Sequence, residues 1–564
     1  MRVSPRSVSL HPNPMRMHTD LPTLERRLLL LATLLLVIGQ FVNLGIQPLY
    51  LEEPRRVIIS MEMVANGNLI VPTLLGELYY NKPPVYNWLL IASAAVFGGW
   101  HEFALRLPTV ISLLLWCWLV YLAGRTRFGQ RFGWYSALCL ACCGAFLYYF
   151  SLLAEIDIFY SLLTWASLTG IFFFTRREKW WLLYLTVYLA AAIGFLTKGL
   201  PSIAFAGISL VVWLAWNKRW RHLFSLAHLV SVLLFFGIVG GYYWWYAQYE
   251  DPSPFLTRLW SETSDRTLSE GSGFLSFLTH LVTFPLNLWA NLLPAGGLLV
   301  VFAFRQKNWQ AFRQNHFLVF CGVMFVANVL IYWLTPAERL RYVYMLFPFL
   351  VYVFVWFWQQ PDNARWAQKT LRWASGLFIH LLPLGALAIL WVPDLQPLPG
   401  LGWISGVFFI LFASLAVLFW RKPDYPFAQL ILAIALSRWL FALTVLPQRN
   451  LDGGAFRDRM RAEQIHELIG EAPLHTEGED KVIAYTSIAY LDRLRSEYVS
   501  RNDSLMHGRY YLVTPDSIAP VLSDTLLEYR YDGLDQQLIK VLSPSTTTTK
   551  VDELMHLRSV DRDP

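Results

Sequence analysis

Two carboxylates and two guanidinium groups stand together directly after the first long apolar run, in the order Glu52-Glu53-Pro54-Arg55-Arg56. A carboxylate can orient or deprotonate an attacking hydroxyl, and a guanidinium can bind a phosphate through two parallel hydrogen bonds. Two adjacent carboxylates in a loop are, however, more often solvated surface than a reactive pair. The run therefore indicates acid–base and phosphate chemistry only where further charged groups gather around it.

A lysine later in the same stretch lies between a tyrosine pair and two prolines, in Tyr79-Tyr80-Asn81-Lys82-Pro83-Pro84. A residue that precedes proline is biased to extended backbone, so Lys82 has a restricted conformation. Its ammonium either binds a phosphate or extends from an apolar stretch towards water, and both readings stay open.

Three further charges lie where apolar runs meet with almost no connecting loop: Glu155, Asp157 and Lys198. Acidic groups pressed against a membrane are costly unless they are paired or functional. Lys198 and Gly199 interrupt the apolar stretch 180–216, which predicts a tight helical hairpin with its cation at the membrane boundary. Such a cation is either functional or a simple anchor.

The elements that position these charges follow from the composition. The chain is 55% hydrophobic and only 15% charged, whereas a soluble chain carries about a quarter charged residues. Long apolar runs fill 27–446, and 447–564 resembles an ordinary soluble sequence. We therefore predict an all-α polytopic membrane domain over 1–446 and a small α/β domain over 447–564.

The number and direction of the spans follow from the basic loops. About 14 apolar runs have roughly the length of a span. If 84–99 lies along the membrane surface, about 13 spans remain, and the basic connections share the side of the Arg-rich N-terminus, which is the cytoplasm. These connections are Arg125–Arg131, Arg176–Lys179, Lys218–Arg221, Arg305–Arg313, Arg365–Arg372 and Arg421–Lys422. The first loop, which is the connection 47–106 after the first span, then faces outward together with Lys198 and the C-terminal domain.

This topology leaves unusual charge on the outer face. Arg341 and Tyr342 begin an apolar run there, and excess external arginine calls for an anionic partner such as a lipid phosphate or for a local ion pair. The long polar connection 247–284 contains Gly271-Ser272-Gly273 and is expected to be a mobile substrate loop. Its candidate substrate contacts are Glu262, Arg266 and His280.

Other features restrict the function. We find no nucleotide-binding glycine loop and no strong metal signature, although Glu155 and Asp157 leave a divalent metal open. The net charge of +7 lies in short clusters between spans, so it does not indicate a nucleic-acid partner. Within the spans, His380 is expected to make a helix–helix contact. Whether Arg438 marks a substrate or ion pathway stays open.

The tail shows β-like runs and one helical stretch, and no catalytic constellation. We expect it to have a structural or acceptor-docking role. The β-like runs are Val482–Ser487, Tyr510–Thr514, Leu527–Tyr531 and Leu538–Leu542, and the helical stretch is Arg457–Ile469.

The first external stretch resembles that of the GT-C glycosyltransferases, in the bacterial branch of the lipid A aminoarabinose transferase, which is related to protein O-mannosyltransferases. The resemblance covers most of the membrane domain. Its matching segments are Glu52–Arg55, Glu62-Met63, Gly67-Asn68, Pro72, Tyr79–Trp88, Glu102–Pro108, Gly194–Gly199, Arg341-Tyr342 and Pro348.

The resemblance implies a GT-C fold of 13 spans with surface helices in the first loop, and an inverting transferase that uses a polyprenyl-phosphate sugar. It places Glu52 at the catalytic carboxylate, where the family usually has Asp followed by Glu, with Glu53 able to share that role. Asp157 matches a second acidic site residue. We expect the donor phosphate contacts to be Lys82, Lys198, Arg341, Arg55 and Tyr342.

These observations predict a multi-pass enzyme of the bacterial cytoplasmic membrane that transfers sugar from an undecaprenyl-phosphate-like donor on the outer face. The expected acceptor is lipid A or another envelope glycolipid or glycan. Three alternatives stay open: a protein O-glycosyltransferase of the same fold, a transporter or flippase of lipid-linked sugars, and a membrane-anchored binding module. A transporter usually places its ionisable groups at the bilayer midplane, where only His380 and Arg438 qualify.

Overall fold

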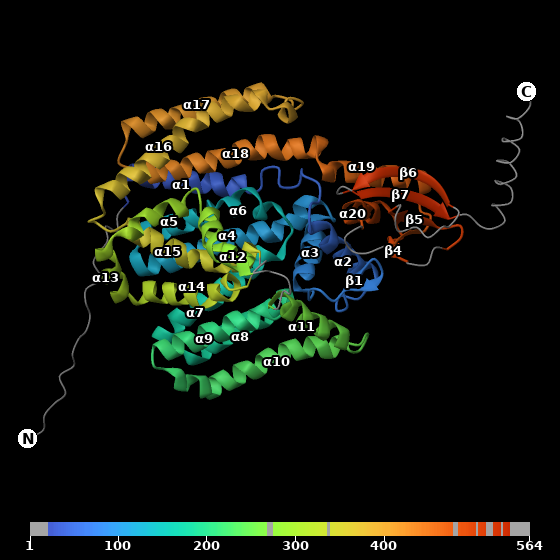
Figure 1. Cartoon of the computed structure of the whole chain (residues 1–564), viewed down its shortest axis with the longest axis horizontal. Coiled ribbons are helices and arrows are strands. Elements are labelled where there is room, and N and C mark those ends of the chain that lie inside the picture. Colours follow the sequence, from blue (N-terminus) through green and yellow to red (C-terminus); the bar gives the residue numbers. More distant parts are fainter. Residues whose placement is uncertain are drawn as a thin grey trace, which may run out of the picture.

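A bundle of long helices carries a small mixed sheet at one end (Figure 1). The structure is a computed structural model that describes residues 21–267, 274–335, 339–477, 483–502, 506–514, 523–531 and 534–541. The first loop, with helices α2 (Glu53–Ala65) and α3 (Val85–Phe97), lies between the bundle and the sheet. The predicted fold class, a polytopic helical domain with a small α/β domain, is confirmed.

Nine stretches of helix within the described residues are long and apolar enough to cross a membrane. Their length follows from the apolar runs, which have roughly the 20 residues that a span needs. They are α4 (Glu102–Phe128), α7 (Ile156–Arg176), α8 (Trp180–Lys198), α10 (Leu226–Tyr246), α14 (His316–Trp333), η4 (Leu340–Leu346) with α15 (Phe347–Trp358), α16 (Arg365–Ala388) with η5 (Ile389–Trp391), α17 (Leu401–Arg421) and α18 (Pro426–Asp452). The protein is therefore a multi-pass membrane protein.

The four other expected spans form shorter or interrupted helices. Two of them are single helices that fall just below 18 residues, and two are broken by turns. They are α1 (Thr23–Gly39), α5 (Gln130–Ala141) with α6 (Gly144–Tyr148), α9 (Pro201–Trp216) and η3 (Gly296–Phe304). The apolar pattern predicts where these segments lie, but it does not show the breaks in backbone geometry.

Helix α3 is the apolar segment that was expected to lie along the membrane surface. Its 13 residues are about 20 Å long, against roughly 30 Å of hydrocarbon. The helix ends at Gly98, whose φ of 81° suits glycine. The length of α3 therefore agrees with the predicted position along the membrane surface.

The connection 247–284 is more ordered than the expected mobile loop. Residues Ser253–Thr267 form α11, and α12 runs from Phe274 to Asn291. One of the apolar runs of span length, 285–304, therefore does not form a single helix, because α12 begins before it and η3 completes it. The Gly271-Ser272-Gly273 stretch lies outside the described residues.

The C-terminal domain has a five-stranded sheet in the order β4-β3-β5-β7-β6. Helix α18 continues past residue 446, and after Gly453 the chain enters α19. The expected helix over 457–469 is confirmed, whereas the expected strand over 482–487 is wrong, because α20 begins at Tyr485 and packs against α19 and α2. The elements are α19 (Gly454–Ile469), β3 (Leu474–Thr476), α20 (Tyr485–Leu494), β4 (Ser500–Arg501), β5 (Tyr510–Val513), β6 (Ser523–Tyr531) and β7 (Leu534–Val541).

The first loop and the C-terminal domain share one hydrophobic core, with Val57 and Ile58 of α2 beside Ile488 and Leu491 of α20. Burial of such side chains stabilises by about 1.5–3 kcal/mol each. The two parts therefore pack as one unit.

Hydrogen bonds fix the orientation of this unit on the bundle. The Tyr490 hydroxyl accepts from the backbone N–H of Leu49 at 2.8 Å and donates to the Glu102 carboxylate at 2.6 Å. Arg493 also donates to Glu102, at 2.8 Å. The C-terminal domain is thereby tied to both ends of the first loop, which runs from the end of α1 to the start of α4.

A short hairpin completes the first loop. Strands β1 (Thr73–Leu74) and β2 (Glu77–Leu78) are joined by Leu75 and Gly76, both at positive φ. The buried Glu62 carboxylate accepts from the Thr73 hydroxyl and from the Leu75 N–H, each at 2.5 Å. Glu62 therefore shapes the loop from within, and burial raises its pKa above the ordinary value.

Two polar residues within the spans have different surroundings. The Nε2 of His380 accepts from the Trp420 indole at 2.7 Å and its Nδ1 contacts the Gly376 carbonyl oxygen at 2.6 Å, which confirms the expected helix–helix contact. Arg438 is fully buried in α18, and its three guanidinium nitrogens have no hydrogen-bond partner among the described residues. Its guanidinium carbon lies 5.6 Å from the centre of the Phe441 ring.

Replacing Arg438 with methionine should raise the thermal unfolding midpoint of the detergent-solubilised protein. Methionine keeps an unbranched apolar chain and removes donors whose burial without partners costs about 1–3 kcal/mol. Arg438→Lys, which keeps a buried cation, is the matched control. A lower midpoint for Arg438→Met would show that the guanidinium has a compensating anionic partner.

Candidate active site

A cavity of about 920 Å³ opens where the first loop, the start of α7, the start of η4 and the C-terminal domain meet. Its walls combine carboxylates, guanidinium groups and tyrosines, which is the residue mixture of a polar binding site. The lining residues are Tyr50, Leu51, Glu52, Tyr149, Phe150, Glu155, Arg339, Leu340, Arg341, Tyr344, Gly454, Ala455, Arg457, Asp458, Arg461 and Thr486.

Glu52 and Glu53 are adjacent but have opposite environments. Glu52 caps the start of α2, lines the cavity, and its side chain is 40% exposed. Glu53 is fully buried. Pro54 occupies the first turn of α2, where its missing N–H costs nothing. The helix start therefore directs one carboxylate outward and the next one inward.

The inward carboxylate forms a bidentate ion pair with Arg106 of α4, at 2.8 and 2.9 Å. Arg106 donates its remaining hydrogens to the carbonyl oxygens of Leu44, Gln47 and Pro48. Glu53 also accepts from the Ala154 N–H at 2.7 Å. This network ties the backbone before Glu52 to the segment before α7.

Arg55 lies beside the outward carboxylate. One of its guanidinium nitrogens is 3.5 Å from the Glu52 carboxylate, and its guanidinium carbon is 4.7 Å from the centre of the Tyr485 ring. Tyr485 begins α20, so the C-terminal domain packs against the cation next to Glu52.

A second charged cluster forms around the start of α7. Lys198 donates to Asp157 at 2.6 Å, and Arg341 lies 3.2 Å from Glu155 and 3.7 Å from Asp157. The Lys198 ammonium is also 4.5 Å from the centre of the Tyr342 ring. Five of the predicted site residues are therefore brought together here, and Glu155 and Arg341 line the same cavity as Glu52.

Local sequence explains how these groups meet. Glu155 is extended and caps α7, so Asp157 falls in its first turn, where the helix dipole favours an anion. Gly199, at φ 85°, ends α8 directly after Lys198, and Pro201 begins α9. The predicted tight hairpin with its boundary cation is confirmed.

Burial raises the pKa of Glu155 to about 7, with the neighbouring Asp157 carboxylate acting in the same direction. The cations Arg56 and Arg341 oppose this shift, and Glu52 adds to it. Glu155 is therefore a carboxyl group that changes its charge near neutral pH at the cavity wall.

Other predicted residues lie outside the cavity lining. Lys82 contacts the Asn81 carbonyl oxygen at 3.1 Å, and Arg258 of α11 donates to the Asn81 side chain at 3.2 Å. His280 of α12 contacts the Tyr332 carbonyl oxygen at 3.2 Å. Glu262 and Arg266 belong to α11, but their side chains lie outside the described residues.

Sequence reasoning did not identify the wall that the C-terminal domain contributes. Arg457, Asp458 and Arg461 come from α19, and Thr486 comes from α20. These residues follow the first loop by about 400 positions, and nothing in their local pattern distinguishes them from a solvated helix. Arg56, buried near Glu155 and Asp157, was noted in its motif but was given no role.

The described residues contain no group of three or more His, Cys, Asp or Glu side chains that could hold a metal ion. Glu155 and Asp157, the two acidic residues that left a metal open, are paired with Arg341 and Lys198.

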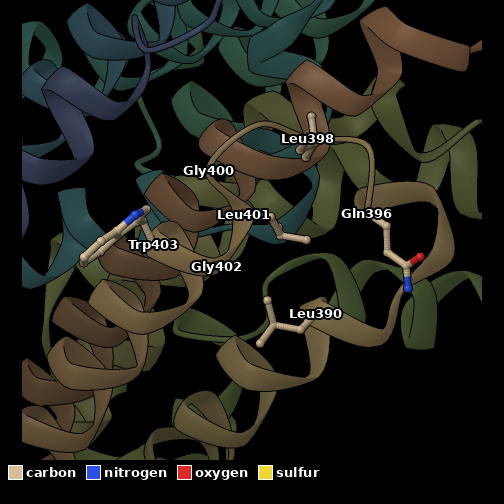
Figure 2. A pocket seen from close by; sticks show the side chains of 7 residues that line it. All are labelled: Leu390, Gln396, Leu398, Gly400, Leu401, Gly402 and Trp403. Carbon is tan, nitrogen blue, oxygen red and sulfur yellow. The ribbon is translucent and has the colours of Figure 1, made fainter.

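A second hollow, of about 610 Å³, lies at the connection between α16 and α17 (Figure 2). It is lined by leucines and glycines with Gln396 and Trp403, and it has no titratable side chain. The charged cavity is therefore the candidate active site.

Comparison with known proteins relates the chain to transferases that use polyprenyl phosphates. Residues 81–245 match the family described as dolichyl-phosphate-mannose-protein mannosyltransferase. An undecaprenyl phosphate-alpha-4-amino-4-deoxy-L-arabinose arabinosyl transferase of Pseudomonas savastanoi is 32% identical over 215 residues, which are 36% of this chain and 38% of the relative. A Sodalis glossinidius protein, arabinosyl transferase 2 of the same kind, is 29% identical over 176 residues, 31% of this chain and 32% of the relative. The alignments thus span about a third of each relative's length.

The fold has a match over nearly the whole chain. The crystal structure of ArnT from Cupriavidus metallidurans bound to undecaprenyl phosphate superposes with a TM-score of 0.65 and 20% sequence identity. The match covers 91% of this chain and 99% of that one. The chain therefore has the GT-C fold that its first loop predicted.

Glu53→Gln should lower the thermal unfolding midpoint strongly, whereas Glu52→Gln should leave it nearly unchanged. Removing one charge from a buried pair costs about 3–5 kcal/mol because Arg106 stays buried without its counter-ion, whereas the pair of Glu52 with Arg55 is partly exposed to solvent. Thermal unfolding of the two purified variants checks this prediction. Equal midpoints would contradict the structural role of Glu53.

The stability of the protein should depend on pH through Glu155. Its pKa is about 7 when folded, against an ordinary value of 4.5, so its contribution is complete below pH 4.5 and is lost as pH rises through 7. Burial also raises the pKa of Asp492, to about 8, so the wild type contains a second such group. Glu155→Gln should therefore reduce, without abolishing, the fall in unfolding midpoint between pH 5 and about 8. An unchanged slope would show that Glu155 is already ionised at pH 5.

Proposed function

We propose that the protein is an inverting glycosyltransferase that moves a sugar from an undecaprenyl-phosphate-like donor to an acceptor of the bacterial envelope. The observation that carries this proposal is the cavity in which Glu52 lies on one wall and Arg341 on another, in a chain with the fold of ArnT. The names of the relatives, which are transferases for undecaprenyl-phosphate-linked aminoarabinose, support the donor class.

The donor phosphate binds at the cluster around Arg341 in this proposal. Arg341 and Lys198 supply positive charge, and the Tyr342 ring lies against the ammonium. Glu155 and Asp157 hold these cations in place before the donor arrives. Because Glu155 protonates near neutral pH, it can release Arg341 to the incoming phosphate. Lys82 and Arg55 are proposed as further phosphate contacts that approach from the first loop.

Glu52 acts on the acceptor. A bond forms between the acceptor oxygen and the anomeric carbon of the sugar, while the bond between that carbon and the phosphate oxygen breaks. Glu52 accepts the proton of an attacking hydroxyl, or orients an acceptor oxygen that is already ionised. The electron pair of the broken bond stays on the polyprenyl phosphate, whose charge is stabilised by Arg341 and Lys198. Glu53 supports Glu52 from within, through Arg106.

The active site faces outward from the cytoplasmic membrane in this proposal. The basic connections predicted to be cytoplasmic include α13 (Gln306–Gln314), which lies at the end of the bundle away from the C-terminal sheet (Figure 1). By the positive-inside rule the cavity end is then external. The polyprenyl chain of the donor lies among the exposed apolar side chains of the spans, in the lipid bilayer.

The acceptor that we propose is lipid A or a similar envelope lipid, because the first loop resembles that of the lipid A aminoarabinose transferase. A protein acceptor is the second candidate, because residues 81–245 match the protein mannosyltransferase family. Radiolabelled donor distinguishes the two, since the product extracts into organic solvent for a lipid and stays with precipitated protein for a protein acceptor.

Glu52→Gln should lower the rate of sugar transfer by at least roughly 100-fold, as expected for loss of a general base. Glu52→Asp, which restores the carboxylate that related enzymes use, should retain measurable transfer. The assay follows release of polyprenyl phosphate from donors of different sugars by purified protein with acceptor lipid. Turnover by Glu52→Gln at the wild-type rate would remove Glu52 from the mechanism.

A further inference from the structure

We propose that α19 forms an oxyanion site for the acceptor, in which Arg457 and Arg461, with Arg339 opposite, bind a phosphate or carboxylate group of an acceptor lipid. This inference rests on the proposed function and specifies how the acceptor is selected. All three arginines line the same cavity as Glu52, and Arg457 and Arg461 belong to α19, an element separate from those that carry the Lys198–Asp157 pair.

Arg457 and Arg461 are four residues apart on α19, so they occupy the same face of the helix and both reach the cavity. Asp458 is 2.9 Å from Arg461 and holds its guanidinium on that face. Arg457 is exposed, and the Arg461 side chain is 18% exposed. Guanidinium groups in this arrangement favour a planar or tetrahedral oxyanion, which they bind through paired hydrogen bonds.

The charges of the cavity separate a donor side from an acceptor side. Arg341 has two carboxylates within 4 Å, Glu155 and Asp157, and lies next to Lys198 at the start of the spans. The α19 wall presents Arg457 and Arg461 to the same cavity, which Glu52 also lines. A second anion therefore has its own pair of guanidinium groups at α19 when the donor phosphate occupies the Arg341 cluster.

The position of this site favours a lipid over a soluble acceptor. Helix α18 ends at Asp452 and α19 begins at Gly454, so the helix that carries the arginines follows a membrane span after a single intervening residue. Arg339 directly precedes the span that starts at Leu340. Cations at the ends of spans lie at the depth of lipid headgroups, where they attract anionic lipids. The C-terminal domain thus contributes specificity as well as structure.

Kinetics of the full-length protein in nanodiscs test this site. Arg457→Gln and Arg461→Gln should each raise the KM for the acceptor lipid roughly tenfold, as loss of a charge-assisted hydrogen bond predicts, while the donor KM stays within about twofold of the wild type. Arg459→Gln is the matched control, because Arg459 lies on the same helix, packs against Phe456 and does not line the cavity. Inorganic phosphate should compete with the acceptor in the wild type and more weakly in the double variant.

Several results would overturn the inference. An unchanged acceptor KM in both variants would do so, as would an equal rise for Arg459→Gln or a rise in donor KM alone. Competition by inorganic phosphate with an unchanged acceptor KM would assign the site to a free anion. If the wild type transfers sugar and both arginine variants have the same acceptor KM as the wild type, only this inference fails. If the wild type releases no polyprenyl phosphate with any donor and acceptor, the proposed function fails as well.

Discussion

The buried ion pair between Glu53 and Arg106 is the constraint on which the rest of the candidate site depends. Arg106 donates hydrogen bonds to Glu53 and to three carbonyl oxygens of residues 44–48, and these bonds fix the conformation of the chain that follows α1. Glu53 then ties α2 to Ala154, just before Glu155 and α7. Since both charges are out of water, each is tolerable only with the other in place. Glu52 is oriented because its neighbour cannot move.

A second constraint comes from the C-terminal domain. Its core is continuous with that of the first loop, and Tyr490 and Arg493 bind Glu102 at the start of α4. The domain therefore fixes the first loop from outside, as Arg106 fixes it from within. It also forms part of the cavity, because residues of α19 line it together with residues at the start of η4. A role limited to anchoring would not require charged residues on that wall.

The sequence predicted the fold and the charged cluster around Lys198 well, because both depend on strong local signals. Apolar runs with basic ends located the spans, and Lys198-Gly199 marked the hairpin that the structure contains. The adjacent glutamates could not be told apart, since only the distant Arg106 decides which one is buried. The strand expected at 482–487 became part of α20, because packing of its apolar residues against α2 and α19 overrides a weak β pattern. The α19 wall had no local signal at all.

In our proposal, a lipid-linked phosphate binds in the cavity that the membrane domain and the C-terminal domain line together. The most direct measurement is a cryo-EM structure of the wild-type protein in nanodiscs supplied with undecaprenyl phosphate. The account predicts phosphate density within hydrogen-bond distance of Arg341, with the isoprenoid chain leading away between spans and Glu52 across the cavity. Phosphate density elsewhere in the bundle, with the Arg341–Glu155 contact unchanged, would contradict it.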